Sequence, residues 1–164
     1  VSTGKDGCVE ASTFYNKGVA RQDFSQAEID FYKKAISLCK DHYKSHFNLG
    51  VVYKKLKRYS EAKAEFKEVI RIKNDLADAH YNLGEIYDTL NDLGFAIEEY
   101  RETIRFDPNK LNAHYNLAGI FASLKQYDRA KGALEESLRI DPSHTPSLVL
   151  LKKVDKNLKT RKNE

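Results

Sequence analysis

Four asparagines, each directly preceded by an aromatic residue, are the side chains of this sequence with the clearest chemical potential. An Asn carboxamide both donates and accepts hydrogen bonds, so it matches the N–H and C=O groups of a peptide bond. The aromatic neighbours offer apolar surface beside each amide. A row of such pairs could hold an extended peptide backbone. Alternatively, the amides could crosslink neighbouring helices and the rings could pack them together. The pairs are Tyr15-Asn16, Phe47-Asn48, Tyr81-Asn82 and Tyr115-Asn116.

The ionisable residues, by contrast, are not arranged for catalysis or metal binding. His46, His80 and His114 recur at one constant interval. Between stacked helix pairs that interval corresponds to about 10 Å, too far for the rings to share an ion. The sequence contains no HExxH, glycine-rich phosphate loop, CxxC or nucleophile elbow. We therefore expect no catalytic residue, no metal ligand and no cofactor, and a protein that is not an enzyme.

The composition is typical of a folded helical protein. The chain has 164 residues, of which 41% are hydrophobic and 32% charged. Eight Gly and three Pro are few, which argues against a many-stranded β-fold. The longest aliphatic run, 148–151, is far shorter than the ~20 residues of a membrane span. The net charge of +4 resides in residues 151–164, so the neutral remainder does not indicate a nucleic-acid-binding surface.

The segments that would position these residues repeat every 34 residues. Within one unit, Leu49, Tyr53 and Leu56 have the spacing of one helical stripe. Ala62 and Phe66 begin a second stripe after a short break. The pattern predicts an all-α fold built from pairs of helices. The clearest copies of the repeated motif are residues 45–50, 79–84 and 113–118.

On these residues the sequence resembles the tetratricopeptide repeat family. The resemblance rests on the 34-residue period, on Asn-Leu-Gly followed three residues later by Tyr, and on the terminal Pro108 and Pro142. It implies a right-handed α-solenoid, a superhelix of stacked antiparallel helix pairs, whose concave face binds peptides. One departure is that His replaces the usual Trp near the start of each unit.

The resemblance also predicts how the chain is organised. We expect a single domain over residues 1–164, in which the first repeat is irregular and about two residues short. Terminal repeats often depart from the pattern because they have only one neighbour. The expected segments are the irregular repeat 1 at 9–42, repeats 2 to 4 at 43–76, 77–110 and 111–144, and a capping helix with a basic tail at 145–164.

By the same resemblance, the four aromatic–Asn pairs are expected to line the concave face together with Lys54 and Glu85. Lys54 belongs to a basic second repeat and Glu85 to an acidic third repeat. A ligand with acidic residues toward the second repeat and basic residues toward the third would be complementary to them. The alternative is that these charges pair with each other between adjacent repeats.

The two cysteines could form a disulfide. Cys8 is expected just before the first helix of repeat 1 and Cys39 at the end of its second helix. Antiparallel helices bring those two ends together, and closing the loop would contribute roughly 3–4 kcal/mol. The alternative is two free thiols in a reducing cytosol. The location is therefore cytoplasmic or, if the cysteines pair, periplasmic or extracellular.

The leading functional hypothesis is a non-catalytic module that binds an extended peptide segment of another protein in a concave groove. One alternative is a structural scaffold that self-associates as a homo-oligomer. Another is the regulatory arm of a larger enzyme. Because the sequence contains no Met, we expect a processed product or a piece of a longer chain.

Overall fold

The computed structural model describes residues 3–162, which form nine α-helices and no strand. This confirms the predicted all-α class. The helices divide into two compact units; unit 1 ends at Ile86 and unit 2 begins at Tyr87, within the fifth helix. The helices are α1 (Thr3–Arg21), α2 (Gln26–Leu38), α3 (Tyr43–Lys55), α4 (Tyr59–Ile72), α5 (Ala77–Thr89), α6 (Leu93–Phe106), α7 (Leu111–Ser123), α8 (Tyr127–Ile140) and α9 (Thr145–Lys162).

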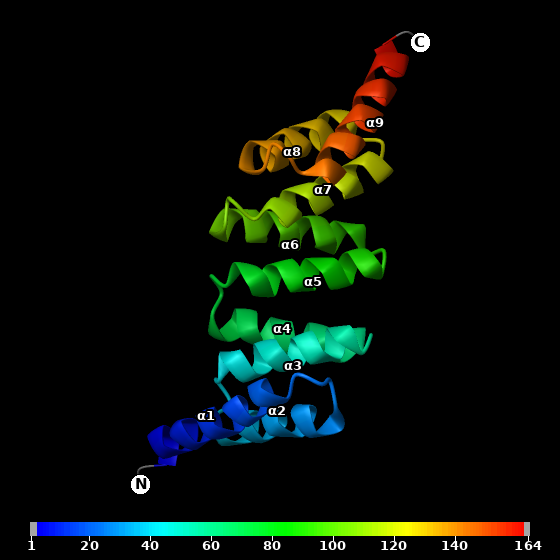
Figure 1. The fold of residues 1–164 in the computed structure, drawn as a ribbon. Helices are drawn as coiled ribbons and strands as arrows, with labels where there is room; N and C mark the ends of the chain where they lie inside the picture. The colour runs from blue at the N-terminus through cyan, green and yellow to red at the C-terminus, as the bar shows by residue number, and fades with distance from the viewer. Residues whose placement is uncertain (1–2, 163–164) are drawn as a thin grey trace. The chain divides into compact units, whose positions relative to one another are not determined.

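Unit 1 contains two helix pairs, α1 with α2 and α3 with α4, and α2 packs against α3 (Figure 1). The start of α2 is set by Ser25, whose hydroxyl accepts a hydrogen bond from the N–H of Glu28. Gln22 and Phe24, in the loop before it, adopt left-handed backbone conformations with φ of 48° and 54°. This compact loop turns the chain back so that α2 runs antiparallel to α1.

The core of unit 1 is built around large side chains that meet small residues on the facing helix. Phe66 of α4 is fully buried, and a Cβ on Gly50 of α3 would lie 3.0 Å from its ring. Leu49 and Tyr53 are buried beside it, as the stripe predicts. Leu56, expected on the same stripe, is instead 41% exposed; it is the C-cap of α3, which ends at Lys55.

The first helix pair carries a covalent link at its open end. Cys8 forms a disulfide with Cys39, the C-cap of α2, with the two Cα atoms 4.8 Å apart. The repeat pattern predicted that Cys8 would lie just before the first helix. Because α1 begins at Thr3, Cys8 instead lies within that helix. Gly7 permits this close approach, since a Cβ there would lie 2.7 Å from the carbonyl oxygen of Leu38.

Unit 2 repeats this arrangement and ends with α9. Within the unit, α6 packs against α7, α7 pairs with α8, and α9 packs against α8 (Figure 1). Leu134 of α8 and Val154 of α9 are buried. The hydroxyls of Ser137 and Ser147 form a buried hydrogen bond of 2.7 Å between α8 and α9. The last helix therefore covers the apolar side of α8, although Leu148 remains 40% exposed.

The turns that join the two helices of each regular repeat share one backbone shape. Lys57, Asn91 and Lys125 occupy the same repeat position and have φ values of 60°, 61° and 57°. Only a few per cent of non-glycine residues adopt this left-handed conformation. The turn thus recurs in the same conformation without a glycine at this position.

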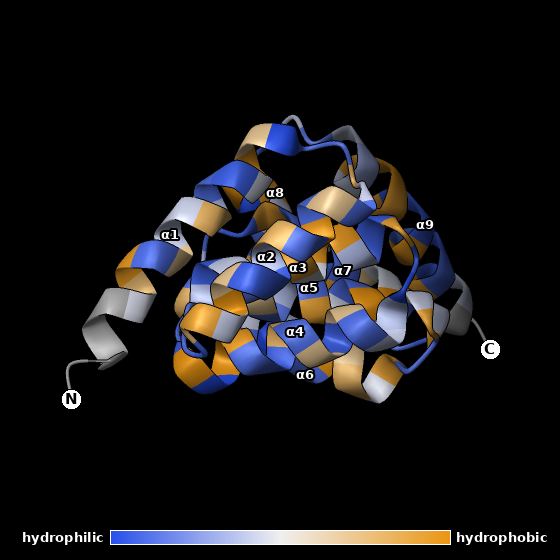
Figure 2. Cartoon of the chain, turned by 90° about the horizontal axis from the view of Figure 1, so that it is seen from below, coloured by the Kyte–Doolittle hydropathy of each residue, from blue (hydrophilic) through white to orange (hydrophobic). Residues whose placement is uncertain are grey.

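The helices are amphipathic rather than apolar throughout. Hydrophobic and hydrophilic residues are interspersed along them in Figure 2. Between residues 3 and 162, no helix combines the length and the hydropathy needed to cross a lipid bilayer.

Candidate functional site

The asparagines of the predicted amide row differ in what they contact. In unit 1, Asn48 Nδ2 donates a hydrogen bond to the Tyr32 hydroxyl at 3.3 Å. In unit 2, Asn116 Nδ2 donates to the Tyr100 hydroxyl at 3.1 Å. Each tyrosine lies 16 residues before its asparagine, so the same link recurs between a repeat and the one that follows it. Asn16 is exposed and forms no hydrogen bond within the described part of the chain.

Asn82 is held differently because Phe66, which has no hydroxyl, occupies the corresponding position. Its Oδ1 accepts a hydrogen bond from Lys54, and its Nδ2 donates to the backbone carbonyl of Asp78 at 2.7 Å. Lys54 also forms an ion pair of 2.7 Å with Glu85. The two charged residues of the predicted site are therefore joined to each other within unit 1.

The four residues of the aromatic row are half-buried and take part in packing. Tyr81 differs from the others because its hydroxyl donates to Glu85 at 3.1 Å. Part of each ring stays accessible beside the amides, so packing and ligand contact are compatible. The ring contacts are Tyr15 with His42, Phe47 with Phe66, and Tyr115 with His144, at centroid distances of 5.3, 5.6 and 5.4 Å.

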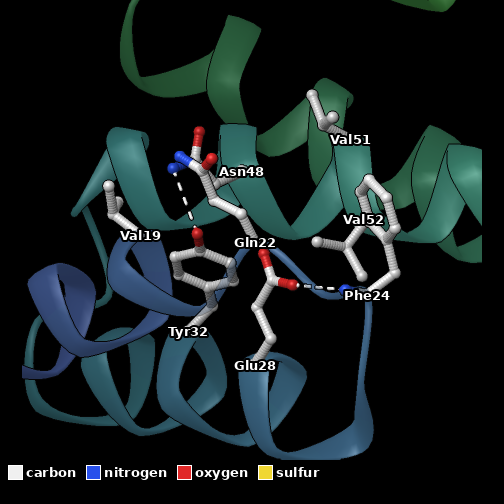
Figure 3. Close-up of a pocket in the computed structure, with 8 residues that line it drawn as sticks. All are labelled: Val19, Gln22, Phe24, Glu28, Tyr32, Asn48, Val51 and Val52. Carbon is white, nitrogen blue, oxygen red and sulfur yellow. Dashed lines mark hydrogen bonds between the residues drawn. The ribbon is translucent and has the colours of Figure 1, made fainter.

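Pockets lie between the first helices of consecutive repeats in both units. In unit 1, a pocket of about 270 Å³ lies between α1 and α3 (Figure 3). In unit 2, one of about 390 Å³ lies between the end of α5 and α7. A further pocket of about 380 Å³ lies between α7 and α9. Asn48 lines the first and Asn116 the second, so the amides border hollows into which a ligand side chain could extend.

These pockets differ in charge because different residues occupy the same repeat positions. Asp88 lines the pocket between α5 and α7, whereas Lys125 and Lys153 line the one between α7 and α9. Between α3 and α5, within unit 1, Lys54 occupies the repeat position of Asp88 and forms an ion pair with Glu85. The chain therefore presents several chemically distinct hollows rather than identical ones.

Glu28 and Tyr32, two polar residues that line the unit 1 pocket besides Asn48, were not among the predicted site residues. Glu28 is only 3% exposed, and its Oε2 accepts a hydrogen bond from the backbone N–H of Phe24 at 2.7 Å. Burial raises the pKa of Tyr32 to about 12, although the hydrogen bond from Asn48 opposes the rise. One sequence feature could have indicated Glu28: Ser25 is followed three residues later by Glu, a capping-box pattern that places the Glu in the first turn of the helix.

The three repeated histidines contact the backbone that precedes their helices. His46, His80 and His114 are buried, and each ring contacts the backbone carbonyl six residues earlier through Nε2. Over residues 3–162, no group of three or more His, Cys, Asp or Glu side chains could hold a metal ion. Each ring thus fastens a first helix to the segment that precedes it.

His46 makes the stability of unit 1 depend on pH. Burial lowers its pKa, but hydrogen bonds to Glu65 and to the Lys40 carbonyl raise it more, so the net pKa is above 6.5. Both partners are acceptors, and a ring that donates to both is the imidazolium. The stability from this pair is fully present below the unfolded pKa and is lost as pH rises through the folded pKa.

We therefore expect the contribution of this pair to the free energy of unfolding to be lost as pH rises above 6.5. The pH slope of wild type should differ accordingly from that of Glu65→Gln, which lacks the pair. Urea unfolding followed by circular dichroism at several pH values measures this. Glu61→Gln is the matched control, because that carboxylate pairs with Arg58 on the exposed side of α4. Equal pH slopes for wild type and Glu65→Gln would contradict the assignment.

Sequence models described as the TPR repeat or tetratricopeptide repeat match four stretches of the chain. Together these stretches run from residue 31 to residue 144, well over half of the sequence. None of the curated proteins matches the sequence. The matched stretches are residues 31–64, 53–91, 77–110 and 111–144.

Solved structures resemble the chain in fold. The crystal structure of MamA has a TM-score of 0.84 over 97% of this chain and 86% of that one, with 19% identity. YrrB, described as a TPR protein with an unusual peptide-binding site, has a TM-score of 0.78, 21% identity and coverages of 91% and 76%. The first TPR domain of Spaghetti, bound to an HSP90 peptide, has a TM-score of 0.67, 17% identity and coverages of 71% and 92%.

Proposed function

Because this chain belongs to the tetratricopeptide-repeat family, we propose that it is a non-catalytic protein–protein interaction module that binds an extended peptide segment of another protein. Amides on the first helices hydrogen bond to the peptide backbone, and the neighbouring rings and pockets receive side chains. The residues proposed to bind are Tyr15, Asn16, Phe47, Asn48, Lys54, Tyr81, Asn82, Glu85, Tyr115 and Asn116.

The observation that carries this proposal is the environment of Asn48. Its Nδ2 is engaged by the Tyr32 hydroxyl, and no described residue donates to its Oδ1. The amide is thus held in one orientation beside a pocket, with a carbonyl oxygen ready to accept a peptide N–H. Holding the group before binding reduces the entropy cost of ordering it.

The amides are not expected to contribute equally. Asn82 already accepts from Lys54 and donates to the Asp78 carbonyl, so a ligand must compete with both bonds. Asn48 has no such competition at Oδ1. We therefore expect Asn48→Ala to weaken peptide binding more than Asn82→Ala.

A pull-down from cells of the source organism tests the proposal with the triple variant Asn48→Ala/Asn82→Ala/Asn116→Ala. A net hydrogen bond contributes about 0.5–1.5 kcal/mol, so losing three should reduce partner recovery about tenfold or more. The matched control is Asn74→Ala/Asn109→Ala, which removes exposed amides in the turns between repeats.

Circular dichroism of each variant verifies that the helices are intact. Unchanged recovery by a folded triple variant would remove the amide row from the mechanism. Light scattering of the wild-type chain tests the alternative scaffold role, because that role requires oligomers at the concentrations used for binding.

A further inference from the structure

The unit 1 pocket contains an acidic group that backbone recognition by the amide row does not use. Glu28 and Tyr32 extend from α2 toward α3, and Phe24 approaches from the loop (Figure 3). Val19 of α1 and Val51 of α3 line the same pocket with apolar surface. The pocket thus combines hydrophobic walls with a carboxylate.

Glu28 is unusual because a buried carboxylate normally has a cationic partner. No Lys, Arg or His of the described residues forms an ion pair with it. Its support is the Phe24 N–H, which donates to Oε2, together with the nearby Tyr32 hydroxyl. A cation that entered the pocket would therefore meet a negative charge shielded from water, where its attraction is strong.

The size of the pocket suits one side chain. Its volume of about 270 Å³ lies below the ~300–1,000 Å³ typical of small-molecule sites. The apolar walls match an aliphatic stem, since long basic side chains lay their methylenes along apolar surface and keep the charged end in polar surroundings.

We propose that this pocket receives an arginine side chain of the bound peptide segment, so that unit 1 selects partners with a basic residue at one position. The inference rests on the function proposed above and names a specificity determinant for the same surface. The guanidinium donates to Glu28 and to one lone pair of the Asn48 Oδ1, whose second lone pair accepts the peptide N–H. Its stem lies against Val19 and Val51. Gln22, which also lines the pocket, supplies a further acceptor.

Arginine fits these acceptors better than lysine. They are contributed by the separate side chains of Glu28, Asn48 and Gln22, and a guanidinium carries five N–H donors in a planar fork. It is also more weakly hydrated than an ammonium group, so it loses less on entering a partly apolar pocket. Lysine is therefore expected to bind more weakly, and the neutral isostere citrulline more weakly still.

The direct test is a nuclear magnetic resonance titration of the full chain with N-acetyl-arginine-N-methylamide. Backbone amide signals of Val19, Glu28 and Val51 should shift in a saturable manner. The equivalent lysine and citrulline compounds are the comparison probes, and citrulline should bind about tenfold or more weakly, because hydrogen bonds to charged groups contribute about 1.5–3 kcal/mol. No saturable shift, or equal shifts with citrulline, would overturn the proposal.

Two variants locate the effect. Glu28→Gln keeps an acceptor for the Phe24 N–H but removes the charge, and should weaken arginine binding about tenfold or more. Val51→Phe fills the pocket and should abolish binding while leaving Glu28 in place. Glu61→Gln, an exposed carboxylate of α4, is the control and should bind as wild type does. Undiminished binding by both pocket variants would refute the assignment.

A displayed library of random peptides separates this inference from the function on which it rests. Enrichment of arginine at one position by wild type, lost with Glu28→Gln, supports both. Enriched peptides without an arginine preference would refute the pocket assignment and leave peptide binding intact. If no peptide is enriched although blocked arginine binds, peptide binding fails while the pocket's chemistry stands.

Discussion

Replacing Phe66 with alanine is expected to reduce the free energy of unfolding by about 3–5 kcal/mol. Phe66 is fully buried in α4, where its ring contacts Phe47 at a centroid distance of 5.6 Å and also lies directly against Gly50. Truncation to alanine removes these ring contacts and leaves a cavity. The cavity stays open because the tightly placed backbone at Gly50 cannot fill it. Denaturant unfolding followed by circular dichroism measures the loss.

Phe95→Ala is the matched control, because it removes the same atoms from a different environment. Phe95 is 58% exposed on α6, where its ring stacks on Tyr87. Exposed substitutions usually change stability by no more than about 0.5 kcal/mol. Similar losses for the two variants, or a loss below 1 kcal/mol for Phe66→Ala, would contradict the packing described here.

Removing the disulfide is the second change with a large expected effect. The bond joins Cys8 to Cys39 across 31 residues, and a loop of that length is expected to contribute about 3–4 kcal/mol by restricting the unfolded chain. Reduction, or Cys8→Ser/Cys39→Ser, should therefore shift the unfolding midpoint to lower denaturant. The first helix pair should respond most, because each repeat is stabilised chiefly by its own packing and its neighbours.

The double serine variant also provides the control, since a reductant should leave its unfolding midpoint unchanged. Two free thiols in protein purified under oxidising conditions would contradict the bond. Disulfides persist in oxidising compartments. Of the two locations left open by the sequence, we therefore propose the periplasm or extracellular space rather than the cytoplasm.

The repeat pattern was a reliable guide to helices and to much of the core. Leu49, Tyr53 and Phe66 are buried as their spacing predicts, because helical periodicity determines which side of a helix faces its partner. The pattern failed at helix ends. Leu56 continues the stripe in sequence but lies after the last turn of α3, and Cys8 lies inside a helix that starts earlier than its repeat motif.

The candidate site could be predicted only in part, because repeat position does not specify a partner. Asn48 and Asn82 are equivalent in sequence, yet one donates to a tyrosine hydroxyl and the other is held by a lysine. The difference arises because Tyr32 and Phe66 occupy the same position on the preceding second helix. To predict this difference from the sequence, one must know that each asparagine meets the residue 16 positions before it across a helix interface.

By itself, the sequence determined the helices and their pairing within each repeat, since both follow from local periodicity. The tertiary structure alone decided which amides are engaged, that Lys54 pairs with Glu85, and that Glu28 is buried in a pocket. These features depend on distances between side chains of different helices. These distances depend on how closely the helices pack against each other. The spacing of residues along the sequence does not give the distance between packed helices.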